Sequence, residues 1–234
     1  MAILQIFNPD EFYTSIDSNK YQAGQFCWIV VPHLTSVPQI LDIERRNPEE
    51  HSEVNFILRN ANRREDFCVS DRTLPIKYLN LRSNEELLVQ RSKRRPGIIL
   101  SRGLDSYPDI TKLLVQKGKK HLQEDAIIVI PCYGIETADD PIGFPPEMVS
   151  RIRCLLYRQF FYFPGNAVFK EGVARLDRIQ TIVGRDPSTI HTTNICLQED
   201  VLNLLLELFI FCMTGIEDEN LSMIRSLTKE TFPS

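Results

Sequence analysis

The residue pair best suited to chemistry in this sequence is Arg175 and Asp177, which one residue separates in the segment 171–182. If this segment is a strand, side chains two residues apart share a face, so Val173, Arg175 and Asp177 point to the same side. A cation held beside a carboxylate can bind a phosphate and move a proton next to it. The alternative is an ordinary lateral ion pair, which at an exposed site contributes about 0–1 kcal/mol.

Four blocks of the sequence, taken in order, resemble one known family. Residues 23–32 read Ala-Gly-Gln-Phe-Cys-Trp-Ile-Val-Val-Pro, and residues 94–101 read Arg-Arg-Pro-Gly-Ile-Ile-Leu-Ser. Residues 126–131 read Ala-Ile-Ile-Val-Ile-Pro, and residues 172–182 read Gly-Val-Ala-Arg-Leu-Asp-Arg-Ile-Gln-Thr-Ile. Together with the apolar segment near the C-terminus, this order is similar to that of the MazF/PemK-like toxins, the endoribonuclease half of type II toxin–antitoxin pairs.

The resemblance implies an α+β fold that is mainly β, namely a small SH3-like antiparallel barrel with a C-terminal helix and large insertions. The family is much shorter than this chain of 234 residues. We therefore expect a single domain over residues 1–234 that carries an insertion at 33–93 and a second elaboration at 134–164.

The resemblance also implies a reaction, the cleavage of single-stranded RNA without a metal or another cofactor. The ribose 2′-hydroxyl attacks the adjacent phosphorus and leaves a 2′,3′-cyclic phosphate. Asp177 matches the position of the base, while Arg175 and Arg95 match cations that stabilise the phosphorane. A carboxylate is a weak base near pH 7, and a guanidinium donates hydrogen bonds but does not give up a proton.

Three further residues are candidates for substrate binding, namely Arg94, Tyr133 and Arg178. The sequence departs from the family pattern after Pro131, where Cys132 and Tyr133 replace the usual Thr or Ser. Arg178 and Gln180 also differ from the family residues. These departures leave a second function open, a catalytically degenerate barrel that serves as a protein- or nucleic-acid-binding module.

The overall composition limits which functions this chain can have. The formal net charge is −4 and the hydrophobic content is 43%, which suits a globular protein without overall attraction to nucleic acid. RNA binding then requires a local basic groove. The expected partners are single-stranded RNA, a cognate antitoxin and a second copy in a homodimer, with no membrane.

The cysteines and the N-terminus favour a cytoplasmic protein. The six cysteines are scattered without a Cys-x-x-Cys pair, which is typical of free thiols in a reducing compartment. The N-terminus lacks the basic start and apolar core of a signal peptide. The apolar segment 197–214 is interrupted by Asp200 and Glu207, which disfavours a membrane span. The four histidines show no metal-ligand spacing.

Apolar patterning predicts strands at 25–31, 98–100 and 127–130, and helices beginning near Pro146 and Gln198. Shorter patterns predict strands at 67–69 and 76–81 and a helix that begins at 83–86. In the segment 151–162 arginines alternate with aromatic residues. This segment is either a base-stacking surface or, as the simpler interpretation, core aromatics beside arginines whose charged ends reach solvent.

Overall fold

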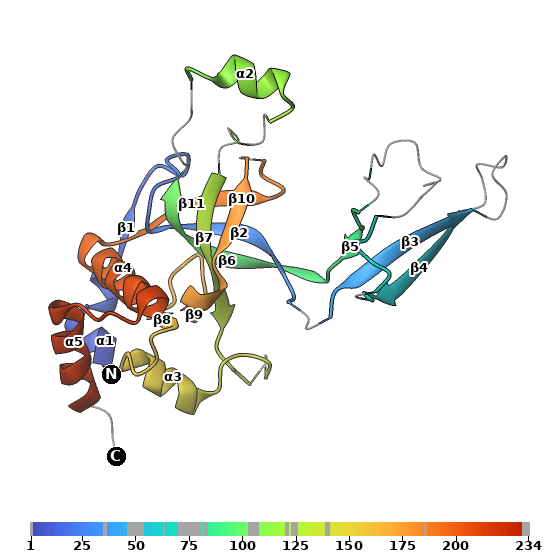
Figure 1. Ribbon diagram of the computed structural model, residues 1–234. Helices are drawn as coiled ribbons and strands as arrows, with labels where there is room; N and C mark the ends of the chain where they lie inside the picture. Colours follow the sequence, from blue (N-terminus) through green and yellow to red (C-terminus); the bar gives the residue numbers. More distant parts are fainter. Residues whose placement is uncertain are drawn as a thin grey trace. The chain divides into compact units, whose positions relative to one another are not determined.

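The computed structural model describes residues 2–34, 37–45, 54–62, 64–69, 81, 84–102, 108–119, 122, 126–138, 141–184 and 186–230. Within these residues the fold is α+β and consists mainly of antiparallel sheet (Figure 1). The chain forms two compact units, one made of Met1–Val30 and Arg94–Ser234 and the other of Val31–Lys93. The second unit covers nearly the same residues as the insertion expected at 33–93. Its origin as an insertion stays a prediction.

The larger sheet has the strand order β1-β11-β2-β6-β7-β9-β8, and β10 also pairs with β7. Its strands are β1 (Tyr13–Ser15), β2 (Gln25–Pro32), β6 (Ser92–Arg102), β7 (Ala126–Gly134), β8 (Phe160–Phe163), β9 (Gly172–Arg175), β10 (Gln180–Val183) and β11 (Ile190–Leu197). This pairing, as far as the described residues show it, follows an open path from β1 to β8, and an SH3-like barrel stays a prediction.

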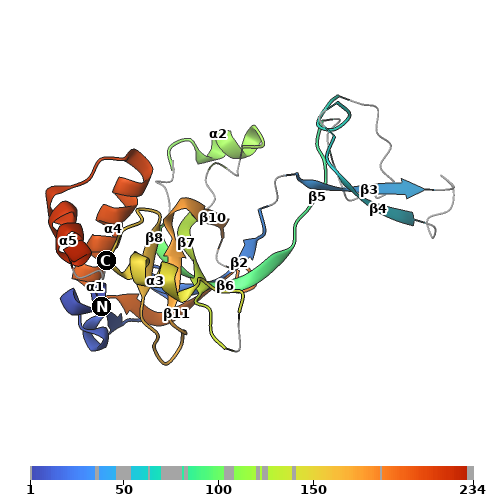
Figure 2. The same cartoon turned by 90° about the horizontal axis from the view of Figure 1, so that it is seen from below.

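The first unit also contains the helices α1 (Ala2–Ile6), α2 (Thr111–Gln116), α3 (Pro146–Arg153), α4 (Glu199–Thr214) and α5 (Glu219–Glu230). Helix α1 contacts both α3 and α5, and α5 in turn contacts α4 (Figures 1 and 2). The predicted helices at Pro146 and Gln198 are confirmed, and so are the strands at 25–31, 98–100 and 127–130.

Helix α4 has clear sequence signals at both ends. The Gln198 side chain accepts a hydrogen bond from the Asp200 backbone N–H, so it satisfies one of the free donors of the first turn. At the other end Gly215 has φ +75°, which an L-side chain rarely adopts, and its N–H bonds to the Phe211 carbonyl. The buried side of the helix repeats every three or four residues and comprises Val201, Leu204, Leu205 and Leu208.

The core of the first unit is rich in aromatic rings. The Phe26 ring lies 5.4 Å from Phe163 and 5.0 Å from Phe169, measured between ring centroids. Phe161 is fully buried and packs against Phe12. The aromatic residues of β8 are therefore core residues, which confirms the simpler interpretation of the segment 151–162.

The second unit contains a sheet of order β4-β3-β5, made of β3 (Gln39–Arg45), β4 (Val54–Asn60) and β5 (Leu88–Val89). Two predictions in this region are wrong. Residues 67–69 are not a strand, and Phe67 lies in a turn with φ +59°. The helix expected from residue 83 is absent from the described residues 84–89, which end in β5. The strand predicted at 76–81 falls almost entirely outside the described residues.

Candidate functional site

The segment 171–182 is not one strand, which corrects the simplest prediction for it. Strand β9 ends at Arg175, a 3₁₀ turn covers Leu176–Arg178, and β10 begins at Gln180. Both β9 and β10 pair with β7, but five residues separate Ala174 from Gln180, whereas only two separate their partners Cys132 and Val129. Three extra residues therefore bulge from the ladder as the turn.

Two features account for the position of this turn. The gap in the β7 ladder lies opposite Ile130 and Pro131, and a proline cannot donate a ladder hydrogen bond. Leu176 anchors the turn because its side chain is fully buried and its N–H bonds to the Gln159 carbonyl at 3.0 Å.

Arg175 and Asp177 form a two-point ion pair across this turn. The distance from Arg175 Nε to Asp177 Oδ1 is 3.0 Å, and the distance from Arg175 Nη2 to Asp177 Oδ2 is 2.5 Å. Arg178 adds a second cation, with its Nε 3.6 Å from Asp177 Oδ2. All three side chains remain partly exposed, at 25%, 34% and 40% for Arg175, Asp177 and Arg178. The predicted adjacency of Arg175 and Asp177 therefore arises from a turn, not from the regular alternation of a strand.

Tyr133 joins this ion pair to the preceding strand. Gly97 pairs with Pro131, so the same register places Arg95 of β6 opposite Tyr133 of β7. The Arg95 guanidinium carbon lies 4.5 Å from the centroid of the Tyr133 ring, and that of Arg175 lies 5.9 Å from it. Contacts of this kind attract a cation to the negative face of an aromatic ring.

Strands β6, β7 and β9 are neighbours in the sheet, and they bring five of the six predicted site residues into one cluster. We call it the arginine cluster, and its members are Arg95, Tyr133, Arg175, Asp177 and Arg178. Its three cations and one anion give a formal charge of +2. Arg94 is exposed, and as the neighbour of Arg95 within β6 it points to the opposite face of the sheet.

Two neighbours of the cluster, Phe160 and Cys212, were not predicted as site residues. Phe160 of β8 pairs with Arg175, whose guanidinium carbon lies 5.6 Å from the centroid of the phenyl ring. Burial raises the pKa of the Cys212 thiol, and the negative charge of Asp177 raises it further, while Arg158 lowers it. Cys212 therefore lies near Asp177 as a neutral thiol rather than a nucleophile. The sequence held one signal for Phe160. The aromatic run before Pro164-Gly165 suggests a hairpin of β8 and β9, which would place Phe160 beside the strand that carries Arg175.

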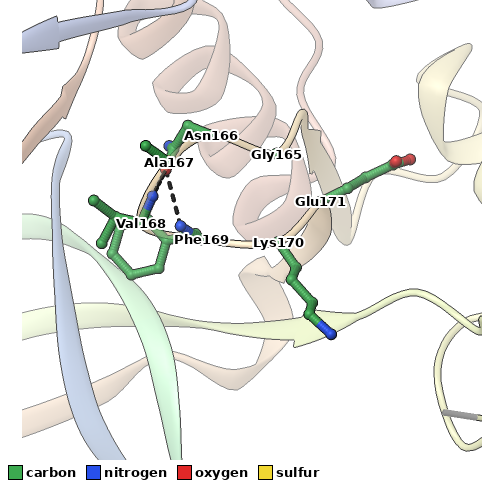
Figure 3. A pocket seen from close by; sticks show the side chains of 7 residues that line it. All are labelled: Gly165, Asn166, Ala167, Val168, Phe169, Lys170 and Glu171. Atoms are coloured by element: carbon green, nitrogen blue, oxygen red, sulfur yellow. Dashed lines mark hydrogen bonds between the residues drawn. The ribbon is translucent and has the colours of Figure 1, made fainter. Parts of the chain in front are cut away.

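The chain also has a pocket of about 490 Å³, which the loop Gly165–Glu171 lines by itself (Figure 3). The Asn166 carboxamide oxygen fills part of this loop and accepts hydrogen bonds from the backbone N–H groups of Val168 and Phe169, at 2.8 and 2.9 Å. The charged side chains of Lys170 and Glu171 point in different directions (Figure 3), and Glu171 pairs with Arg153. The pocket therefore belongs to a loop that the Asn166 side chain holds in place, and none of its lining residues is a member of the arginine cluster.

Among the residues that the structure describes, His, Cys, Asp and Glu side chains do not gather in groups of three or more that could hold a metal ion. In the same part of the chain, no helix is both long and apolar enough to cross a membrane. Comparison with models of known protein families, with curated proteins and with solved structures finds no match for this chain. The arginine cluster and its chemistry are therefore the features of this chain that point to a function.

Proposed function

We propose that this chain is a metal-independent endoribonuclease of the MazF/PemK-like toxin type, which cuts single-stranded RNA. The observation that carries the proposal is the arginine cluster, in which Arg95, Tyr133 and Arg175 meet although they come from separate parts of the sequence. The four resembling blocks lie on β2, β6, β7 and β9, which follow one another in the sheet. An SH3-like barrel, a cognate antitoxin and a homodimer belong to the same proposal.

The cluster supplies groups for each step of a 2′-hydroxyl attack. Arg95 and Arg175 hold the scissile phosphate and stabilise the charge that develops on the phosphorane. Asp177 takes the proton of the 2′-hydroxyl while the bond from the 2′ oxygen to phosphorus forms. The bond from phosphorus to the 5′ oxygen then breaks, and the Tyr133 hydroxyl gives its proton to that oxygen. The products are a 2′,3′-cyclic phosphate and a free 5′-hydroxyl.

The ion pair adds a condition to this mechanism. Two donors of the Arg175 guanidinium, Nε and Nη2, are occupied by the Asp177 carboxylate. A phosphodiester that binds the same edge of Arg175 must therefore displace Asp177. This exchange couples binding to catalysis, because the displaced carboxylate is then free to accept the 2′-hydroxyl proton.

A cleavage assay with end-labelled single-stranded RNA tests the proposal. We expect fragments ending in a 2′,3′-cyclic phosphate in the presence of a metal chelator, and loss of cleavage in Arg175→Ala and Asp177→Asn. Arg151→Ala is a matched control, because Arg151 lies on α3 and bonds to its own helix through the Glu147 carbonyl. Cleavage that persists in both cluster variants would remove these residues from the mechanism.

The paired state of Asp177 also supports the second candidate, a module that binds RNA or protein without cutting. In this state the carboxylate accepts two hydrogen bonds from Arg175 and lies close to Arg178, so it acts as a structural partner of the two cations. The two candidates differ in a simple assay. A non-cutting module retains intact RNA in a binding experiment, and its expression in a bacterium causes no toxicity that a neighbouring antitoxin relieves.

A further inference from the structure

The small sheet of the second unit has one apolar face. In β4 the side chains of Phe56 and Leu58 lie on the same face, and their partners in β3 are Ile43 and Leu41. Val54 continues this face at the start of β4. Phe56 is 62% exposed and Leu58 is 52% exposed, so the face is open to solvent where the two large side chains lie.

The opposite face carries an ion network at Arg59, while Ile57 on that face is 41% exposed. Arg59 donates to both carboxylate oxygens of Asp66, at 2.8 and 2.6 Å, and also bonds to Asp42. The Asp66 side chain is only 1% exposed. The single charged residue of β4 is therefore neutralised within its own unit, and it lies on the face away from Phe56 and Leu58.

Strand β4 is also an edge strand. The Ala61 N–H bonds to the Pro38 carbonyl at 2.8 Å, and the Leu41 N–H bonds to the Leu87 carbonyl at 2.9 Å. Because backbone groups alternate along an antiparallel ladder, the odd-numbered residues of β4 bond to β3 and the even-numbered ones face outward. Within the described residues β4 pairs with β3 alone. The outward N–H and C=O groups belong to Val54, Phe56, Leu58 and Asn60.

We propose that β4 pairs antiparallel with β4 of a second copy of this chain, around a two-fold axis that passes beside Ile57. This register places Phe56 opposite Leu58 of the second copy, and Asn55 opposite Arg59. Every outward residue of one strand then meets an outward residue of the other, because Val54 falls opposite Asn60. A register centred on a neighbouring residue leaves one outward residue beyond the end of the partner strand. The inference is independent of the RNA chemistry.

The pattern of side chains favours a second copy as the occupant. Arg59 meets a neutral asparagine rather than its own copy, so like charges do not oppose each other. The apolar face continues from one copy to the next through the pairs of Phe56 and Leu58. The strand also lacks proline and lysine, which proteins use to keep sheet edges apart. A two-fold interface of this kind is self-complementary.

Sedimentation of the full chain tests the pairing first. We expect a concentration-dependent dimer of twice 27.1 kDa. Leu58→Pro removes an outward N–H that the internal ladder does not use, and it should raise the dissociation constant at least about tenfold, because two hydrogen bonds of the dimer are lost. Val69→Pro is the control, because Val69 is an exposed residue of the same unit that lies outside the sheet. Unchanged thermal unfolding of Leu58→Pro would show that the unit remains folded.

Cysteine cross-linking then tests the register. In a Cys68→Ser background, which removes an exposed thiol, Ile57→Cys places two cysteines directly opposite each other across the axis. Their Cα atoms are then about 4.5 Å apart, within the range of a disulfide. Leu58→Cys should not cross-link, because the two copies of residue 58 are displaced along the strands to more than about 7 Å.

Three results would overturn the proposal. A chain that stays monomeric at high micromolar concentration has no such interface. A dimer that Leu58→Pro leaves intact forms elsewhere. Equal cross-linking of the Ile57→Cys and Leu58→Cys variants excludes the register. Each readout is an association measurement, so failure here leaves the RNA cleavage test unaffected, whereas a purely monomeric chain would also contradict the homodimer that belongs to the proposed function.

Discussion

The Asp177→Asn variant is the most informative perturbation of the arginine cluster, because it separates binding from cleavage. Asp177 is both the proposed base and the anion that occupies two donors of Arg175. Loss of a general base usually lowers the rate by about 10²–10⁴-fold. Loss of the competing carboxylate should instead strengthen the binding of a phosphate. We therefore expect this variant to bind RNA more tightly and to cut it far more slowly.

The size of the binding effect follows from charge. The formal charge of the cluster rises from +2 to +3 when the carboxylate is removed. A unit charge about 4 Å from a phosphate in a solvated site is worth about 1 kcal/mol, or about a fivefold change in affinity. One additional phosphate contact also steepens the plot of log affinity against log salt by about 0.7 for a single strand. The gain in affinity should therefore shrink about 2.5-fold between 50 and 200 mM salt.

Fluorescence anisotropy with an RNA that lacks the attacking 2′-hydroxyl measures this effect over a salt titration. Glu230→Gln is the control, since it removes one negative charge from the end of α5 and should leave the salt dependence unchanged. Weaker binding by Asp177→Asn, or a salt dependence equal to that of the unaltered protein, would refute phosphate binding at the Arg175 edge. Undiminished cleavage by the same variant would refute the role of Asp177 as the base.

Three further predictions concern the cluster, the core and alkaline pH. Arg95→Ala should lower RNA cleavage by at least about 100-fold while Arg95→Lys retains part of it, because only a guanidinium binds a phosphate at two points; equal activity of both variants in the cleavage assay would contradict this. Leu205→Ala should lower the free energy of unfolding by about 2–5 kcal/mol in a urea titration, since Leu205 is fully buried; a loss below about 1 kcal/mol would show that α4 packs loosely. Burial raises the pKa of Cys27 from 9.0 to about 12, so the thiol of the unfolded chain loses its proton at a lower pH than that of the folded chain. The free energy of unfolding should therefore fall as the pH rises from about 9 to about 12, by at most about 4 kcal/mol from this group. Cys27→Ala should show a shallower fall in urea titrations across that range, and an unchanged slope would contradict the assignment.

The sequence predicted elements well where one pattern dominates. Residues 127–130 of strand β7 are a continuous run of β-branched residues and α4 has signals at both ends, so propensity and burial agree there. Strand β11 went unpredicted because Thr192, Thr193 and Asn194 interrupt its apolar pattern. Thr193 is accommodated through a hydrogen bond from its hydroxyl to the Phe26 carbonyl, a contact that exists only in the folded sheet.

The candidate site was predictable in its members but not in its geometry. The spacing of Arg175 and Asp177 suggested that they are neighbours, and the Arg95–Tyr133 contact required the register of β6 against β7. The turn between Arg175 and Gln180 follows from a mismatch in length between two ladders, which is a property of the folded sheet. The hairpin of β3 and β4 was overlooked because its charges, including the Arg59 network, hid the alternation of its apolar face.

Strands β9 and β10 both pair with β7. The number of residues in the turn between them is therefore fixed by the register of these two pairings. Deleting one residue such as Ile179 would reverse which side chains of β10 point inward, because faces alternate at every residue. A deletion of this kind would move Ile182, now partly buried, to the exposed position that Thr181 occupies. The turn therefore tolerates exchange of its exposed side chains far better than a change in length, and libraries that vary 177–179 at constant length, with Leu176 retained as the buried anchor, are the productive way to remodel the cluster.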